Sequence, residues 1–224
     1  MKREIKTTLD GSKTLHINEL NENYHSQHGA LQEANHVFIE NGIKLVNNYE
    51  INILELGFGT GLNVLVTINE LLKNDKNHII NFFTLEKYPI KESEYLDLEY
   101  NLLFEFEKSR EIYLKVHECE WNEMTEIIPG FNLKKINCDF FDLKDLKLPE
   151  INLVYFDCFG ARVQPDLWEK TLFEMVSDKM AKDGLLTTYS SKGSVRRILQ
   201  DLNFKVEKKA GPPAKREMIN AVKL

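Results

Sequence analysis

The sequence predicts an α/β protein whose mostly parallel sheet is covered by helices on both faces, and two observations lead to that prediction. Short aliphatic runs alternate along the chain with stretches whose apolar residues recur at helical spacing. The run at 151–156 is almost continuously apolar, which is typical of a strand buried on both faces. Ligands bind such sheets at the carboxyl ends of the strands, so the residues that follow each strand are candidates for a functional site.

The elements are assigned in chain order from the spacing of apolar residues and the positions of Gly and Pro. Strands are expected in the sheet at residues 51–56, 79–85, 131–137, 151–156 and 184–189. Helices are expected at residues 62–72, 92–106, 108–128, 165–180 and 194–201. The stretches 204–209 and 217–222 are expected to close the sheet as an antiparallel pair.

Residues 1–48 differ from the rest, because they contain no complete strand and helix unit and are rich in Asn, His, Glu and Gln. We expect them to form an N-terminal extension that packs on the active-site edge of the sheet or stays partly mobile. Residues 49–224 are expected to form one Rossmann-like domain.

The composition limits the class of protein. With 42% hydrophobic and 29% charged residues, the 224-residue chain is expected to be a globular protein of one large or two small domains. It contains no apolar run long enough to span a membrane, and its charged N-terminus lacks the apolar core of a secretory signal, so a cytoplasmic location is expected. Three widely spaced cysteines indicate free thiols, and the histidines have no acid or cysteine at ligand spacing, so no metal is expected.

The strongest local signal is the stretch 55–63 (ELGFGTGLN), where the first strand turns into the first helix. Its glycines let the backbone turn sharply and approach a ligand closely, and the free amides at the N-terminus of the following helix are expected to face an anionic group. A dinucleotide-binding fingerprint would place its third glycine where Leu62 stands. The stretch instead resembles the GxGxG motif of S-adenosylmethionine-dependent methyltransferases.

Acidic residues at the ends of successive strands strengthen this interpretation. A carboxylate at Glu86 can accept hydrogen bonds from two ribose hydroxyls, and one at Asp139 can accept from an adenine amine. Any single acid is more simply explained as a helix N-cap or a solvated loop residue, but several at one edge of a sheet favour a site. The residues expected to bind the donor are Glu55, Gly57, Phe58, Gly59, Thr60, Gly61, Asn63, Glu86, Lys87 and Asp139.

The C-terminal part of the chain carries an excess of positive charge. From Lys192 to the end, nine basic and three acidic residues give a net charge of +6, against −12 for residues 1–191. This asymmetry fits an anionic partner such as a nucleic-acid backbone, and charge alone fits a solvated face at least as well.

Further motifs resemble one family of methyltransferases. The stretches 157–168 (DCFGARVQPDLW), 194–199 (SVRRIL) and 215–218 (KREM) resemble the methyltransferase domain of the MnmC family, and residues 24–38 resemble its lead-in segment. The resemblance implies a Rossmann-like class I S-adenosylmethionine-dependent methyltransferase fold. It also implies N-methylation of 5-aminomethyl-2-thiouridine at the wobble position of bacterial tRNA, which gives 5-methylaminomethyl-2-thiouridine.

The family resemblance also sets the expected cofactors and partners. Many members are fused to a flavin-dependent oxidoreductase that prepares the amine, and this chain is too short to contain one. We therefore expect a stand-alone methyltransferase that uses S-adenosylmethionine without flavin or metal and depends on a separate enzyme to generate the aminomethyl group. Its RNA partner is expected to be the tRNA anticodon stem-loop.

Roles for individual residues follow from the expected reaction. Asp157 is expected either to orient the acceptor amine and remove its proton or only to orient it, with a turn-forming aspartate as the structural alternative. Phe159 and Trp168 are candidates for an aromatic wall beside the flipped base, with core packing favoured for Trp168, while Tyr24 and Ser26 are expected to close the site. The candidates for phosphate contacts are Arg162, Lys192, Arg196, Arg197, Lys215 and Arg216.

Three other functions remain open on the sequence. An aminopropyltransferase would use the same sulfonium pocket with a polyamine acceptor, and would have no use for a basic C-terminal region. A small-molecule methyltransferase would turn over without tRNA. A non-catalytic RNA-binding module would not bind S-adenosylmethionine.

Overall fold

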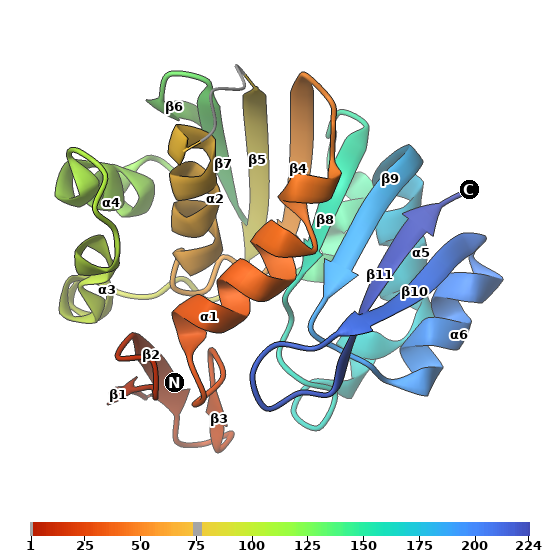
Figure 1. The fold of residues 1–224 in the computed structure, drawn as a ribbon, viewed down its shortest axis with the longest axis horizontal. Coiled ribbons are helices and arrows are strands. Elements are labelled where there is room, and N and C mark those ends of the chain that lie inside the picture. The colour runs from red at the N-terminus through yellow and green to blue at the C-terminus, as the bar shows by residue number, and fades with distance from the viewer. Residues whose placement is uncertain (1, 74–77) are drawn as a thin grey trace.

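The computed structural model describes residues 2–73 and 78–224, and an eight-stranded sheet runs through its centre (Figure 1). Its strands are β4 (Glu50–Leu56), β5 (Ile79–Glu86), β6 (Met124–Ile128), β7 (Phe131–Asn137), β8 (Ile151–Phe156), β9 (Met180–Thr188), β10 (Phe204–Ala210) and β11 (Glu217–Lys223). They lie in the order β10-β11-β9-β8-β4-β5-β7-β6. The pairings from β9 through β8, β4 and β5 to β7 are parallel, and those made by β6, β10 and β11 are antiparallel.

Strand β4 lies in the middle of the sheet, where the order of the strands along the chain reverses. It pairs with β5 on one side and with β8 on the other, so that Ile53 is in register with both Phe82 and Leu153. Chain connections leave the sheet in opposite directions at such a point, and a crevice opens outside the carboxyl ends of the strands. The predicted fold class is confirmed, including the antiparallel C-terminal pair.

Helices cover both faces of the sheet. The α-helices are α1 (Ala30–Ala34), α2 (Leu62–Lys73), α3 (Glu92–Leu98), α4 (Ser109–Glu118), α5 (Lys170–Lys179) and α6 (Gly193–Asp201). α1 continues as a π-helical segment, η1 (Asn35–Glu40), and short 3-10 helices occupy Ile43–Leu45, Tyr100–Leu103, Phe140–Asp145 and Pro165–Trp168. No helix among residues 2–73 and 78–224 is both long enough and apolar enough to cross a membrane.

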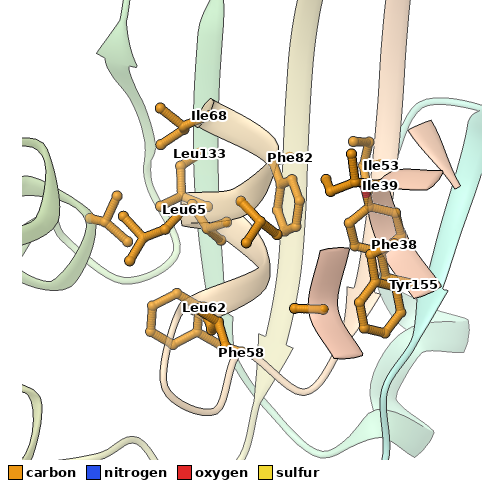
Figure 2. Packing of buried hydrophobic residues seen from close by; sticks show 14 of the residues in the cluster. Phe38, Ile39, Ile53, Phe58, Leu62, Leu65, Ile68, Phe82, Leu133 and Tyr155 are labelled. Carbon is orange, nitrogen blue, oxygen red and sulfur yellow. The ribbon is translucent and has the colours of Figure 1, made fainter. Parts of the chain in front are cut away.

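The central strands are buried on both faces, which explains their continuous apolar runs. In β8, Leu153 and Tyr155 belong to the core on the α2 side, whereas Val154 and Phe156 belong to the core on the α5 and α6 side. On the α2 side, the ring of Phe38 in η1 lies 4.8 Å from that of Tyr155. Figure 2 shows part of this cluster, with Leu65 and Phe82 near α2 and Phe38 close to Tyr155. Phe58 of the glycine loop and Leu62 at the start of α2 belong to the same core, so this packing helps to hold the loop at the carboxyl end of β4.

The N-terminal residues form a small sheet of their own. Its antiparallel strands are β1 (Arg3–Thr7), β2 (Lys13–Ile17) and β3 (Glu22–Asn23), and the sequence did not predict them. In Figure 1 this sheet lies at the lower end of the molecule, toward which the arrow of β9 also points. Arg3 Nη1 lies 3.0 Å from Glu94 Oε2 of α3, and Tyr100 Oη donates to the carbonyl of Lys13 at 2.7 Å. These contacts attach the N-terminal sheet to the chain that follows β5.

The prediction of a helix at 108–128 is wrong in its second half. Helix α4 ends at Glu118, and Met124–Ile128 form β6, an edge strand antiparallel to β7. The turn between the two strands contains Gly130, whose φ of +82° is easily adopted only by glycine. The predicted helices at 92–106 and 165–180 are each divided, with a 3-10 helix after α3 and another before α5. The extended backbone of Glu169 separates the latter pair.

Candidate active site

A cavity of about 760 Å³ opens at the carboxyl end of the large sheet. Its walls come from the residues that follow β4, β5, β7 and β8 and from the N-terminal segment. They comprise residues 22–28, 57–60, 62–63, 86–88, 139–141, 157–160 and 163–167 together with Glu33, Tyr189 and Lys215. A cavity of this size accommodates a nucleoside-sized ligand and part of a second molecule.

The glycine loop lines this cavity and brings backbone close to it. Gly57 and Gly59 have φ values of +103° and +52°, which residues with side chains rarely adopt. A Cβ atom at Gly57 would lie 3.0 Å from the carbonyl oxygen of Asp157, and one at Gly59 would lie 3.2 Å from the ring of Tyr24. Larger residues would therefore crowd the space between the loop and the opposite walls.

The amides of this loop have partners within the protein. Those of Gly57 and Phe58 donate to the carbonyl of Leu85 at 3.0 and 3.1 Å, and that of Gly61 donates to the carbonyl of Phe58 at 2.8 Å. These three amides are therefore occupied within the protein, and the expectation that the amides at the N-terminus of α2 face an anionic group stays a prediction. The loop offers a ligand close backbone contact at Gly57 and Gly59.

Glu86 and Asp139 stand at the expected strand ends and line the cavity with Lys87. The carboxylate of Glu86 accepts from the amide of Gly59 at 3.1 Å and from that of Tyr88 at 2.7 Å, so the backbone holds it in place. Asp139 Oδ2 lies 2.7 Å from Lys87 Nζ, and this hydrogen bond holds the pKa of Asp139 below its usual value. Its other oxygen caps the 3-10 helix that follows.

Asp157 follows β8 and is half-buried in the cavity wall. Asn63 Nδ2 donates to its Oδ2 at 2.8 Å, and Oδ1 has no hydrogen-bond partner within the described residues. Burial raises the pKa of Asp157 to about 7, and the negative charge of Glu33 raises it as well. The hydrogen bond from Asn63 and the positive charge of Lys215 lower this pKa. A carboxyl group with a pKa near neutral pH is suited to accept and release a proton.

Aromatic and charged side chains from both ends of the chain complete the cavity. The rings of Tyr24 and Phe159 meet edge to face with centroids 5.1 Å apart. Lys215 Nζ lies 2.6 Å from Glu33 Oε1 and 3.9 Å from the centroid of the Tyr189 ring. The wall therefore presents aromatic surface beside one lysine that is already neutralised by a carboxylate.

Several of the predicted site residues lie elsewhere. Glu55 and Gly61 do not line the cavity, and Glu55 has an exposed fraction of 0% inside the sheet. Arg162, on the surface, lies 2.6 Å from Glu22 Oε2. The other basic candidates outside the cavity lining are Lys192, Arg196, Arg197 and Arg216. Ser26 lines the cavity, whereas Trp168 is buried and its Nε1 donates to the carbonyl of Phe159, which confirms core packing.

Sequence reasoning missed several cavity residues, among them Tyr189, His25 and Glu33. Tyr189 directly follows β9, so attention to every strand end would have included it. His25 Nε2 lies 3.3 Å from Thr60 Oγ1, and burial lowers the pKa of this histidine to about 4, so that it is neutral at pH 7. Glu33 reaches the cavity because α1 packs next to Lys215, a contact between distant segments that no local pattern reveals.

The described residues contain no group of three or more His, Cys, Asp and Glu side chains that could hold a metal ion. Cys119, Cys138 and Cys158 are free thiols, as predicted.

A doubly wound sheet with a glycine turn and strand-end acids around one cavity defines a class I S-adenosylmethionine-dependent methyltransferase fold. The close backbone at Gly57 and Gly59 and the fixed carboxylate of Glu86 fit an adenosyl ligand. Residues 106–224 match the family described as S-adenosyl-L-methionine-dependent methyltransferase, and the chain belongs to this family. The donor predicted from the sequence is thereby confirmed.

The chain is also similar to particular proteins whose names are more specific than the family description. The tRNA 5-methylaminomethyl-2-thiouridine biosynthesis bifunctional protein MnmC of Leptospira interrogans is 30% identical over 214 residues, which cover 88% of this chain and 32% of the relative. The protein of the same name from Idiomarina loihiensis is 29% identical over 211 residues, covering 88% and 34%. The crystal structure of MNMC2 from Aquifex aeolicus matches with a TM-score of 0.81 and 28% identity, over 98% of this chain and 70% of that one. The chain spans about a third of the length of the curated relatives it matches.

Proposed function

We propose that this protein methylates the primary amine of 5-aminomethyl-2-thiouridine at the wobble position of tRNA in the cytoplasm. The observation that carries the proposal is that Asp157, a carboxyl group with a pKa of about 7, shares one cavity with the glycine loop and Glu86. The names of the relatives from Leptospira and Idiomarina place those proteins in tRNA 5-methylaminomethyl-2-thiouridine biosynthesis. The aminomethyl group would be generated by an enzyme activity outside residues 49–224, which we assign to methyl transfer.

We assign the donor side of the cavity to the glycine loop and the acids that follow β5 and β7. When bound, S-adenosylmethionine supplies a methyl group on a sulfonium sulfur, so the donor is already activated. Gly57 and Gly59 leave room for it, and Glu86 is positioned to accept hydrogen bonds from ribose hydroxyls. Asp139 and Lys87 border the adenine side, and the buried residues Phe58 and Thr60 complete the wall.

The acceptor side is assigned to the surroundings of Asp157. A protonated amine has no lone pair for attack, so the enzyme must bind or generate the neutral form. Oδ1 of Asp157 is free to accept the proton, while Asn63 holds Oδ2. Because the donor needs no further activation, most of the rate enhancement is expected from positioning the amine at attacking distance. Tyr24 and Phe159 supply the aromatic surface for the uracil ring.

The RNA is expected to approach along the basic residues outside the cavity. Lys192 precedes α6, Arg197 lies in its first turns, and both are exposed. Arg216 is exposed next to Lys215, whose own side chain points to the cavity residue Glu33. We therefore assign the exposed arginines and Lys192 to phosphates of the anticodon stem-loop, and Lys215 and Ser26 to the rim around the acceptor base.

The function is tested by incubating the protein with methyl-labelled S-adenosylmethionine and tRNA isolated from cells that lack this methylation. Nucleosides released from the tRNA are then separated and weighed by mass spectrometry. The expected product is the wobble nucleoside with one labelled methyl group, in amounts that depend on the enzyme. The Asp157→Asn variant is the matched control and is expected to lose at least about a hundredfold in turnover.

Two results would contradict this function. Label transferred to free amines as fast as to tRNA would favour a small-molecule methyltransferase. Label that stays on the donor, with tRNA bound but unchanged, would favour a binding module. Aminopropyl transfer is tested separately with decarboxylated S-adenosylmethionine and a polyamine acceptor, and the family assignment predicts that this assay is negative.

A further inference from the structure

Glu55 is a carboxyl group enclosed within the large sheet. It lies in β4 between β5 and β8, and its exposed fraction is 0%. Thr84 Oγ1 of β5 donates to its Oε2 at 2.6 Å. Its other oxygen, Oε1, is buried and has no hydrogen-bond partner within the described residues. An ionised carboxylate is costly to bury without a donor for each oxygen, so the unpartnered Oε1 disfavours the ionised form of Glu55.

Asn63 also has a buried oxygen without a hydrogen-bond partner among the described residues. It lies in the first turn of α2 with an exposed fraction of 4%, and its Nδ2 donates to Asp157 Oδ2 at 2.8 Å. Its Oδ1 is buried and also lacks a partner within the described residues. The Asn63 side chain lies within hydrogen-bonding reach of the Glu55 carboxyl group. A single proton between the unpartnered carboxyl oxygen and the unpartnered amide oxygen would satisfy both.

We propose that Glu55 is protonated and that its Oε1 hydroxyl donates to Asn63 Oδ1, so that Glu55 is a positioning residue for Asp157. This inference rests on the proposed role of Asp157 in proton transfer. The hydrogen bonds then run in one direction, from Thr84 through Glu55 and Asn63 to the catalytic carboxylate. With its oxygen held by Glu55, the Asn63 amide can present only its NH₂ group to Asp157.

The charges around Glu55 agree with the neutral form. Burial raises its pKa well above the usual value, and the negative charges of Asp157 after β8 and Glu86 at the end of β5 act in the same direction. Donation from Thr84 opposes this effect, and so would donation from the Asn63 amide to an ionised Glu55. When a protonated Glu55 donates to Asn63 Oδ1 instead, the Asn63 contact favours the neutral form. Among the described residues, the buried Tyr155 hydroxyl of β8 is also close enough for the charge of Glu55 to raise its pKa.

The relay has a consequence for the reaction. The Asn63 hydrogen bond lowers the pKa of Asp157 against the effect of burial. If the amide turned, its oxygen would face the Asp157 carboxylate, and the pKa of Asp157 would rise further. A protonated Glu55 therefore keeps Asp157 available as a base near neutral pH, although Glu55 itself does not line the cavity.

The decisive variant is Glu55→Gln, because a glutamine amide can donate to Asn63 and its oxygen can accept from Thr84. We expect kcat with the aminomethyl tRNA within about twofold of the parent protein and an unchanged midpoint in the plot of kcat against pH. Glu55→Leu removes the donor, so we expect kcat to fall by about tenfold to a hundredfold, with a midpoint moved to higher pH and little change in KM for the donor. Glu50→Gln, at the exposed start of the same strand, is the matched control.

Infrared difference spectroscopy reads the protonation state without any substrate. At pH 8 the parent protein minus Glu55→Gln should show the carbonyl band of a carboxylic acid, and no such band should appear for Glu50→Gln. Carboxylate bands in place of the acid band would overturn the proposal, and so would a Glu55→Gln variant that folds but loses turnover as Glu55→Leu does. Absence of tRNA methylation by the parent protein would instead refute the proposed function and leave the infrared result standing.

Discussion

The carboxyl group of Asp157 should make the folded protein less stable at high pH than at low pH, and Asp157→Asn should remove that effect. Its pKa is raised from 3.8 to about 7 in the folded protein, a difference of about 3. The folded state therefore keeps a proton between pH 4 and 7 that the unfolded state has released, so the stability contributed by this group falls as the pH rises through that window. At about 1.4 kcal/mol per pKa unit, the loss approaches about 4 kcal/mol above pH 7.

This difference is measured by urea unfolding of the parent protein and Asp157→Asn at pH 5 and pH 8. The variant should be more stable by about 1.5 kcal/mol at pH 5 and by about 4 kcal/mol at pH 8, or about 10 °C in Tm at the higher pH. Asp201→Asn, an exposed change in α6, should alter stability by less than about 0.5 kcal/mol at either pH. Equal stabilities of the variant and the parent at pH 8 would refute the account of Asp157 as a desolvated carboxyl group.

Three further predictions concern donor binding, RNA binding and the rate. Gly59→Ala places a side chain on a backbone with φ of +52° and against the ring of Tyr24, so calorimetry should show a Kd for S-adenosylmethionine that is about tenfold higher or more. The control Gly11→Ala has φ of +84° and open space around it, so it should lower the stability of the protein and leave this Kd unchanged. Lys192→Ala and Arg197→Ala, which change exposed residues, should each reduce the slope of log affinity for tRNA against log salt by about 1. Unchanged slopes in a salt titration would show that these residues do not contact RNA phosphates. Because Asp157 must be ionised to accept a proton, kcat should rise about tenfold per pH unit below pH 7 and level off above it; a flat profile from pH 5 to pH 8 would be inconsistent with a base at this position.

The sequence predicted the central strands well because their burial leaves a direct trace in composition. A strand such as β8, buried on both faces, has apolar residues at nearly every position, so Ile151–Phe156 was assigned with the bounds that the structure shows. Strand β6 lies at the edge of the sheet, and only Ile127 is fully buried in it. The residues of β6 therefore show no alternation of apolar and polar side chains. Because they come shortly after an amphipathic helix, the sequence analysis assigned them to that helix.

The candidate site divides in the same way. Glu86, Asp139 and Asp157 were predicted because parallel strands bring their carboxyl ends to one edge, a rule that needs only the order of elements. Glu33 and Lys215 are 182 positions apart, and their contact depends on how the N-terminal helix packs against the C-terminal loop. No spacing within the sequence encodes such a contact, so Lys215 was predicted for phosphate contacts and Glu33 received no role.

The N-terminal segment lines the cavity and also influences the pKa of Asp157. Residues 22–28 form part of the wall that removes water from the site, and Glu33 places a negative charge near Asp157. Both effects raise the pKa of Asp157, so the strength of this base depends on a segment that comes from outside the large sheet. If the segment moved away from the cavity, the Asp157 carboxylate would be better hydrated and its pKa would fall. In the proposed mechanism, packing of the N-terminal segment against the site therefore favours proton acceptance by Asp157.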